Sequence, residues 1–238
     1  MEKFSASRAE RLMNCTASGD LDTAIPNWKA PIEDPDADTA ANRGTRMHEL
    51  FAMTSQLTPK EMWAMTKALQ YVAVLRQRRR FTVLSEQTEM ADWLNTPVST
   101  TADLVLYTKD EIHIIDFKWG KILVEAMNNE QLLYYAATYA KYAPKAKEVT
   151  LHIVQPNADN FEEWTVPTAY ILGFMVKARQ AQDDLLAGNL SFLPGDHCTF
   201  CPANPHSRGA KGSPLCPTVM QMLYPAPFDE DALLEEET

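Results

Sequence analysis

The residues best suited to chemistry in this chain are a carboxylate and an amine two positions apart, Asp116 and Lys118. They close the run 112–118, whose apolar and β-branched residues predict a β-strand. Successive side chains of a strand point to opposite faces, so these two fall on the same face. The sequence therefore predicts that a carboxylate and an amine share one pocket.

A second acid, Asp103, lies in the preceding strand-like run, 98–107, and only a polar pair at 109–110 intervenes. This pattern predicts an antiparallel hairpin with a two-residue turn, whose register sets Asp103 directly opposite Asp116. Like charges placed opposite each other repel unless a cation lies between them or one acid keeps its proton. We favour a divalent cation, and an oxygen-rich site with open positions suits Mg²⁺ or Mn²⁺.

A further metal ligand is predicted at His48, in a stretch with helical periodicity from about 38 to 53. Gly44 lies one turn upstream on the same face, where glycine costs about 1 kcal/mol relative to alanine. Its presence favours a close approach of another group at that level. A helix-packing glycine and a surface histidine would explain the pattern alone, but the neighbouring hairpin favours a ligand.

The elements that must position these residues follow from periodicity and capping. Gln131 and Tyr135 lie four residues apart in the helical stretch 125–142, so they face the same way. Packing is the default for the tyrosines of this stretch, but a buried glutamine needs polar partners, which an active site or a phosphate supplies. The remaining predicted elements are helices at 7–14, from 58 onward and at 167–187, and strands at 81–86, 148–155 and 162–166.

In this order the residues resemble the PD-(D/E)XK nuclease superfamily, in its RecB-like branch. The matching elements are Gly44 through His48, Asp103, Asp116 through Lys118, and Gln131 to Tyr135. Glu86 resembles an upstream acidic position of that family, with Glu89 as a rival. Thr100 stands where members often carry a glycine three residues before the first aspartate.

The resemblance implies an α/β fold, a mixed β-sheet flanked by helices with a restriction-endonuclease-like core, that hydrolyses phosphodiester bonds. The same chemistry can be built from the side chains, with one or two metal ions activating phosphate and water. The predicted ligands are His48, Asp103, Asp116 and the Phe117 carbonyl. Lys118 is placed to orient the water or take its proton. Gln131 and Tyr135 would hold the nucleic-acid backbone or the ligand shell.

Four cysteines lie towards the ends of the chain: Cys15, Cys198, Cys201 and Cys216. Without a signal peptide or a run of transmembrane length, we expect a reducing compartment and metal ligation rather than disulfides. The arrangement resembles the iron–sulfur RecB-like nucleases, including the CRISPR-associated exonuclease family and phage-encoded relatives, and implies a [4Fe–4S] cluster clasping the chain ends. The fourteen residues between Cys201 and Cys216 depart from the family spacing. Zn²⁺ on these thiolates, alone or with His197 or His206, and four unrelated thiols remain alternatives.

The 238 residues, 45% of them apolar, predict one domain over 1–228 and an acidic, disordered tail at 229–238. The net charge of −10 argues against a nucleic-acid partner, but six of the surplus acids lie in the tail. Basic residues gather at 76–80 and near Lys118, where we favour a phosphate-tracking edge over a solvated helix end.

We therefore expect a metal-dependent DNA exonuclease acting on single-stranded or end-exposed DNA in phage-type recombination or repair. We expect it in the cytoplasm of a bacterial or phage-infected cell, with no membrane partner. One alternative is a catalytically weak DNA-binding or scaffold protein of the same fold, paired with an annealing or helicase protein. Another is a structure-specific endonuclease or nickase.

Overall fold

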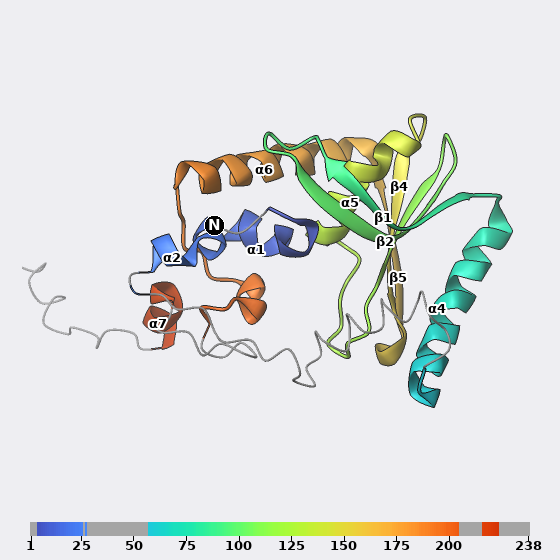
Figure 1. Cartoon of the computed structure of the whole chain (residues 1–238), viewed down its shortest axis with the longest axis horizontal. Helices are drawn as coiled ribbons and strands as arrows, with labels where there is room; N and C mark the ends of the chain where they lie inside the picture. The colour runs from blue at the N-terminus through green and yellow to red at the C-terminus, as the bar shows by residue number, and fades with distance from the viewer. Residues whose placement is uncertain (1–3, 26, 28–56, 205–215, 224–238) are drawn as a thin grey trace, which may run out of the picture. The chain divides into compact units, whose positions relative to one another are not determined.

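The computed structural model describes residues 4–25, 27, 57–204 and 216–223 (Figure 1). The chain divides into two compact units. The smaller contains residues 1–2, 11–33 and 184–238, and the larger contains 3–10 and 34–183. Whether both units fold cooperatively as the single domain expected over 1–228 stays a prediction.

A five-stranded sheet forms the centre of the larger unit. Its strands are β1 (Thr82–Ala91), β2 (Val98–Tyr107), β3 (Ile112–Phe117), β4 (Glu148–Gln155) and β5 (Asn160–Pro167). They lie side by side in chain order, with β3 and β4 parallel and the other neighbours antiparallel. The predicted α/β class with a mixed sheet is confirmed, and β1 and β5 are longer than the sequence indicated.

Helix α5 (Glu130–Tyr139) connects the parallel pair β3 and β4, which a tight turn cannot join. It begins after Asn129, whose side-chain carbonyl accepts a hydrogen bond from the Leu132 amide at 3.1 Å. The predicted start near residue 125 was wrong, because residues 120–128 form a loop bound to other parts of the unit. The side chains of α5 pack on one face of the sheet.

Helix α4 (Pro59–Arg78) covers the other face of the sheet (Figure 1). Its predicted start is confirmed: the Glu61 amide donates to the Thr58 hydroxyl at 3.3 Å and the Thr58 amide donates to the Glu61 carboxylate at 2.8 Å. The buried side chains of this layer are Ala64, Met65, Ala68, Val72, Leu75, Leu104, Leu106, Ile115 and Phe117. Since Ile115 and Phe117 face α4, Asp116 between them faces α5.

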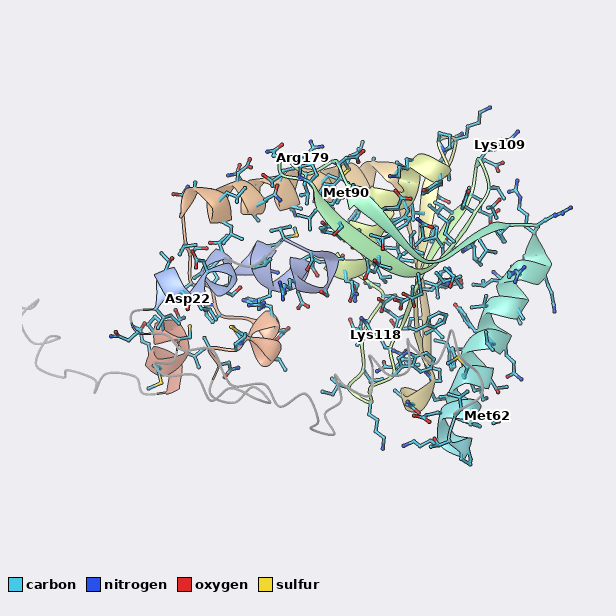
Figure 2. The ribbon with its side chains drawn as sticks, in the orientation of Figure 1. Asp22, Met62, Met90, Lys109, Lys118 and Arg179 are labelled. Atoms are coloured by element: carbon cyan, nitrogen blue, oxygen red, sulfur yellow. The ribbon has the colours of Figure 1, made fainter. Side chains whose placement is uncertain are left out.

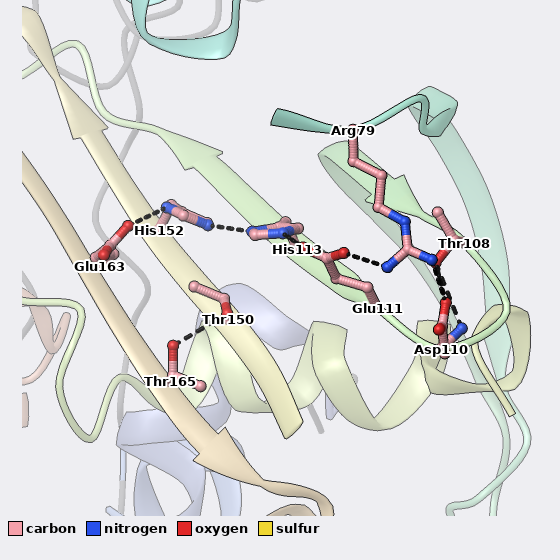
Figure 3. A network of polar contacts seen from close by, with 9 residues as sticks. All are labelled: Arg79, Thr108, Asp110, Glu111, His113, Thr150, His152, Glu163 and Thr165. Carbon is pink, nitrogen blue, oxygen red and sulfur yellow. Dashed lines mark hydrogen bonds and ion pairs between the residues drawn. The ribbon is translucent and has the colours of Figure 1, made fainter. Parts of the chain in front are cut away.

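Two buried histidines also lie on the α4 face (Figure 3). His113 Nδ1 and His152 Nε2 are 2.9 Å apart, and the Tyr71 hydroxyl lies 2.9 Å from His152 Nδ1. Burial, followed by the nearby His113 and Arg78, lowers the pKa of His152 to about 3. The His152 ring is therefore neutral at pH 7 and serves the packing of α4 rather than the predicted site.

The smaller unit joins segments from both ends of the sequence by hydrogen bonds. The Ala17 amide donates to the Ser191 carbonyl at 3.1 Å, and the Ser191 amide donates to the Thr16 hydroxyl at 2.8 Å. The short helices here are η2 (Thr16–Gly19), α2 (Leu21–Ala24), η6 (Asp196–Phe200) and α7 (Pro217–Leu223). Helices α1 (Ala9–Asn14), after the turn η1 (Ala6–Arg8), and α6 (Thr168–Ala187) have residues in both units. In the part of the chain described, no helix has both the length and the apolar character needed to cross a bilayer.

Candidate active site

The hairpin β2–β3 has the predicted register. Leu104 pairs with Ile115 and Tyr107 with Ile112, and the turn closes where Thr108 donates to the carbonyl at position 111 at 2.8 Å. One step beyond the last of these pairs, the same register places Asp103 opposite Asp116. The side chain of Asp103 accepts a hydrogen bond from the Phe117 amide at 2.7 Å. In a regular ladder a backbone carbonyl of β2 would accept this bond.

The surroundings of Asp103 disfavour its charged form. Burial raises the pKa of Asp103 to about 8, and the negative charge of Asp116 is the second cause. The Phe117 amide opposes this increase, as Lys118 does more weakly. Asp103 retains some solvent exposure, but the surrounding protein atoms keep enough water away to favour its neutral form. A proton on Asp103 thus relieves the repulsion expected between two opposed acids.

The buried Asp116 Oδ2 lacks a hydrogen-bond partner among the described residues. Lys118 Nζ lies 2.8 Å away, an ion pair by distance, but the angles are not those of a hydrogen bond. Two carboxylates, one with an unsatisfied oxygen, fit a Mg²⁺ ion, which typically keeps several waters and takes one or two protein carboxylates. The donor set is therefore compatible with a divalent cation.

A chain of hydrogen bonds links Lys118, which directly follows β3 and is labelled in Figure 2, to helix α5. Lys118 Nζ donates to Gln131 Oε1 at 2.7 Å, and Gln131 Nε2 donates to the Tyr135 hydroxyl at 3.0 Å. Burial raises the pKa of Tyr135, so this hydroxyl stays protonated at neutral pH. The predicted side-by-side placement of Gln131 and Tyr135 is present, and both lie beside the aspartate pair.

A third acid, Glu86 on β1, lies opposite Asp103 on β2, since the β1–β2 pairs on either side of it keep one register. Its charge also raises the pKa of Asp103, and its backbone has a positive φ of 48°, which is uncommon for this residue type. The rival Glu89 forms an ion pair with Lys141 at 2.9 Å and a hydrogen bond with Tyr142. The structure therefore brings Glu86, and not Glu89, near Asp103.

Some predicted groups lie outside the described residues: Gly44, His48, His206 and the tail 229–238. Within the residues that are described, no three His, Cys, Asp or Glu side chains come together as a ready metal site. The roles of His48 and of the Phe117 carbonyl as ligands stay predictions.

All four cysteines line one pocket in the smaller unit, together with Ser18, Leu193, His197 and Asn204 among others. None forms a disulfide. The C-x₂-C turn is closed by the Cys201 amide, which donates to the Cys198 carbonyl at 3.0 Å, and Asn204 donates to the same carbonyl at 2.9 Å. Burial raises the pKa of the Cys201 thiol. The predicted gathering of distant cysteines is therefore present, and the bound metal stays a prediction.

One polar residue near the site carries no signal in the sequence. Gln155 ends β4, and its buried side chain binds the loop between Lys118 and α5. Its partners lie more than thirty residues earlier in the chain, so no local pattern indicates them.

The chain matches one protein family and is distantly similar to several solved structures. A candidate exonuclease from Eubacterium rectale has 12% identity and a TM-score of 0.46, over 93% of this chain and 92% of that one. An alkaline exonuclease from Laribacter hongkongensis has 13% identity and a TM-score of 0.33, over 76% of this chain and 91% of that one. Residues 54–216 match the model of a family described as a protein of unknown function, DUF2800. As this match spans more than half of the sequence, the chain belongs to the DUF2800 family.

Proposed function

We propose that this protein is a deoxyribonuclease dependent on Mg²⁺ or Mn²⁺ that acts as an exonuclease on single-stranded or end-exposed DNA. The observation that carries the proposal is the pairing of Asp103 and Asp116 at one end of a hairpin, with a buried carboxylate oxygen 2.8 Å from the amine of Lys118. A fold gains nothing from two opposed acids unless a cation or a proton relieves them. The resemblance to the RecB-like nucleases supports the same reading.

Different residues of the site would have different roles in the reaction. Asp103 and Asp116 would hold a divalent cation, which would polarise the scissile phosphate and acidify a bound water. The Lys118 amine is placed to orient the attacking water or accept its proton. Gln131 holds that amine at 2.7 Å, and Tyr135 fixes the orientation of the Gln131 amide. The amine is thus positioned before substrate arrives, which reduces the entropy cost of reaction.

Basic residues at the end of α4 would follow the DNA backbone. Arg79 forms ion pairs with Asp110 and Glu111, each at 2.8 Å. It therefore stabilises the hairpin turn rather than contacting phosphate. Arg78 and Arg80 are exposed and provide positive charge for phosphate contacts. We infer that binding weakens as salt concentration rises, despite the chain's net charge of −10.

We further propose that the four cysteines bind a [4Fe–4S] cluster, with Zn²⁺ as the alternative. The support is their shared pocket and the C-x₂-C turn. Such a group would add to the hydrogen bonds that already join the two chain ends, so its role is structural. Metal analysis and the visible absorption spectrum of anaerobically purified protein test this. Iron with sulfide, or zinc alone, identifies the group, and metal-free folded protein refutes both forms of the proposal.

The experiment that tests the proposed activity compares linear and circular DNA, single- and double-stranded, with Mg²⁺ or Mn²⁺. An exonuclease degrades linear DNA alone, an endonuclease also opens circles, and a binding protein cuts neither. Asp116→Asn should abolish cleavage of every substrate, while Asp183→Asn, on an exposed part of α6, should not. Cleavage by Asp116→Asn at the wild-type rate would refute the proposed centre.

A further inference from the structure

The loop 119–128, between Lys118 and α5, displays apolar side chains beside the predicted site. Ile122, Leu123 and Met127 are 51%, 68% and 61% exposed, and Lys121 is exposed as well. Single exposed apolar residues are ordinary, but a group of them on one segment is typical of an interaction surface.

Buried Gln155 holds the backbone of this loop. Its Nε2 donates to the Gly120 carbonyl at 3.1 Å and the Ile122 carbonyl at 2.6 Å. Its Oε1 accepts from the Val124 amide and from Asn160, each at 3.2 Å. Both donors and both acceptor positions of the amide are used, so the side chain is fully satisfied only with the loop in this conformation.

Other polar side chains from the β4–β5 end hold the loop at further points. Asn157 donates to the Trp119 carbonyl at 2.8 Å, and Asn160 donates to the Val124 carbonyl at 2.8 Å. The Ala126 amide donates to the Glu162 carboxylate at 2.9 Å. These bonds satisfy the backbone while leaving the apolar side chains outside. The loop therefore presents a preformed apolar surface, and binding to such a surface avoids the cost of ordering it.

The position of this surface limits what it can contact. Ile122 is four residues beyond Lys118, and a fully extended chain spans at most about 3.6 Å per residue, or about 14 Å here. Successive base pairs rise by about 3.4 Å. Ile122 thus lies within roughly four base-pair steps of a phosphate held at Lys118, and Leu123 follows it directly in the chain. Lys121, on the same loop, adds a positive charge for a neighbouring phosphate.

We propose that Ile122, Leu123 and Met127 form a platform for unpaired bases of the DNA strand next to the phosphate being cleaved. Proteins insert Ile, Leu and Met side chains between bases, and the faces of all four bases accept such contacts without sequence preference. The inference rests on the proposed function for the location of the phosphate. It goes beyond that function by assigning the loop to the bases rather than to the backbone.

The test measures binding rather than cleavage, so the two proposals fail separately. A fluorescent 15-nucleotide oligodeoxythymidylate and an abasic strand of the same length are titrated with the full-length protein, with Ca²⁺ in place of Mg²⁺ to prevent cleavage. Leu123→Ser is compared with Leu172→Ser, the same exchange at a 57% exposed position on α6. Thermal unfolding of both variants accompanies the titration.

We expect wild-type protein to bind the thymidine strand about tenfold more tightly than the abasic strand. Leu123→Ser should lose most of that preference with unchanged affinity for the abasic strand, while Leu172→Ser should match wild type. Equal binding of both strands by wild type, or an unchanged preference in Leu123→Ser, would overturn the platform. So would a lower unfolding temperature in Leu123→Ser with an unchanged preference, which would mark the loop as an internal packing surface. Absence of cleavage, by contrast, would refute only the proposed nuclease activity.

Discussion

Replacement of Asp103 by asparagine should stabilise the metal-free protein. The pKa of Asp103 is raised from 3.8 to about 8, so at pH 7 the unfolded chain holds this group ionised while the folded chain must protonate it. The penalty grows as pH rises from about 4 towards 8, and at pH 7 it reaches at most about 4 kcal/mol. Asparagine needs no proton, can still accept the 2.7 Å bond from Phe117, and offers an amide donor to Asp116.

The assay is thermal unfolding in EDTA at pH 4.5 and pH 7, with Asp92→Asn, at an exposed position, as the matched control. For a chain of this size about 1 kcal/mol corresponds to roughly 2 to 4 °C. The gain in Asp103→Asn should be several degrees at pH 7 and nearly vanish at pH 4.5. Addition of Mn²⁺ should then stabilise wild type and leave Asp103→Asn unchanged. A variant that is no more stable than the control at pH 7 would refute the raised pKa of Asp103 in its buried position beside Asp116.

Two further predictions concern other groups. His152 has a pKa lowered to about 3, so its contribution to stability is present above about pH 6.5 and is lost as pH falls. Urea unfolding should compare the free energy of unfolding of wild type and His152→Gln at pH 7 and pH 5. The difference should shift by about 2 kcal/mol in favour of the variant at pH 5. A difference that stays constant would contradict the buried neutral ring. Lys118→Met should lower the cleavage rate by a factor of roughly 10²–10⁴ while Mn²⁺ binding persists, and Lys177→Met is the control. Loss of Mn²⁺ binding in Lys118→Met would instead make Lys118 a structural residue.

The features that the sequence predicted correctly depend on local rules. A two-residue turn fixed the register of the hairpin, and the period of two placed Asp116 and Lys118 on one face. The capping box at Thr58 and Glu61 located the start of α4. Each rule uses residues a few positions apart, and their geometry is determined by the chain itself.

The features that could not be predicted depend on long-range partners. The start of α5 was misplaced because residues before Asn129 are held by Gln155 and its neighbours, from more than thirty positions further along the chain. The choice between Glu86 and Glu89 depends on tertiary contacts, since Glu89 is held by Lys141 and Tyr142 while Glu86 acts on Asp103. The buried His113–His152 contact likewise joins two strands through tertiary pairing alone.

Anomalous diffraction from crystals soaked in Mn²⁺ tests the proposed metal centre at Asp103 and Asp116 most directly. We expect one or two anomalous peaks within coordination distance of both the Asp103 and Asp116 carboxylates, and no peak there in crystals of Asp116→Asn. Anomalous peaks elsewhere, with none beside Asp103 and Asp116 at saturating Mn²⁺, would contradict a metal-dependent nuclease centre at this hairpin.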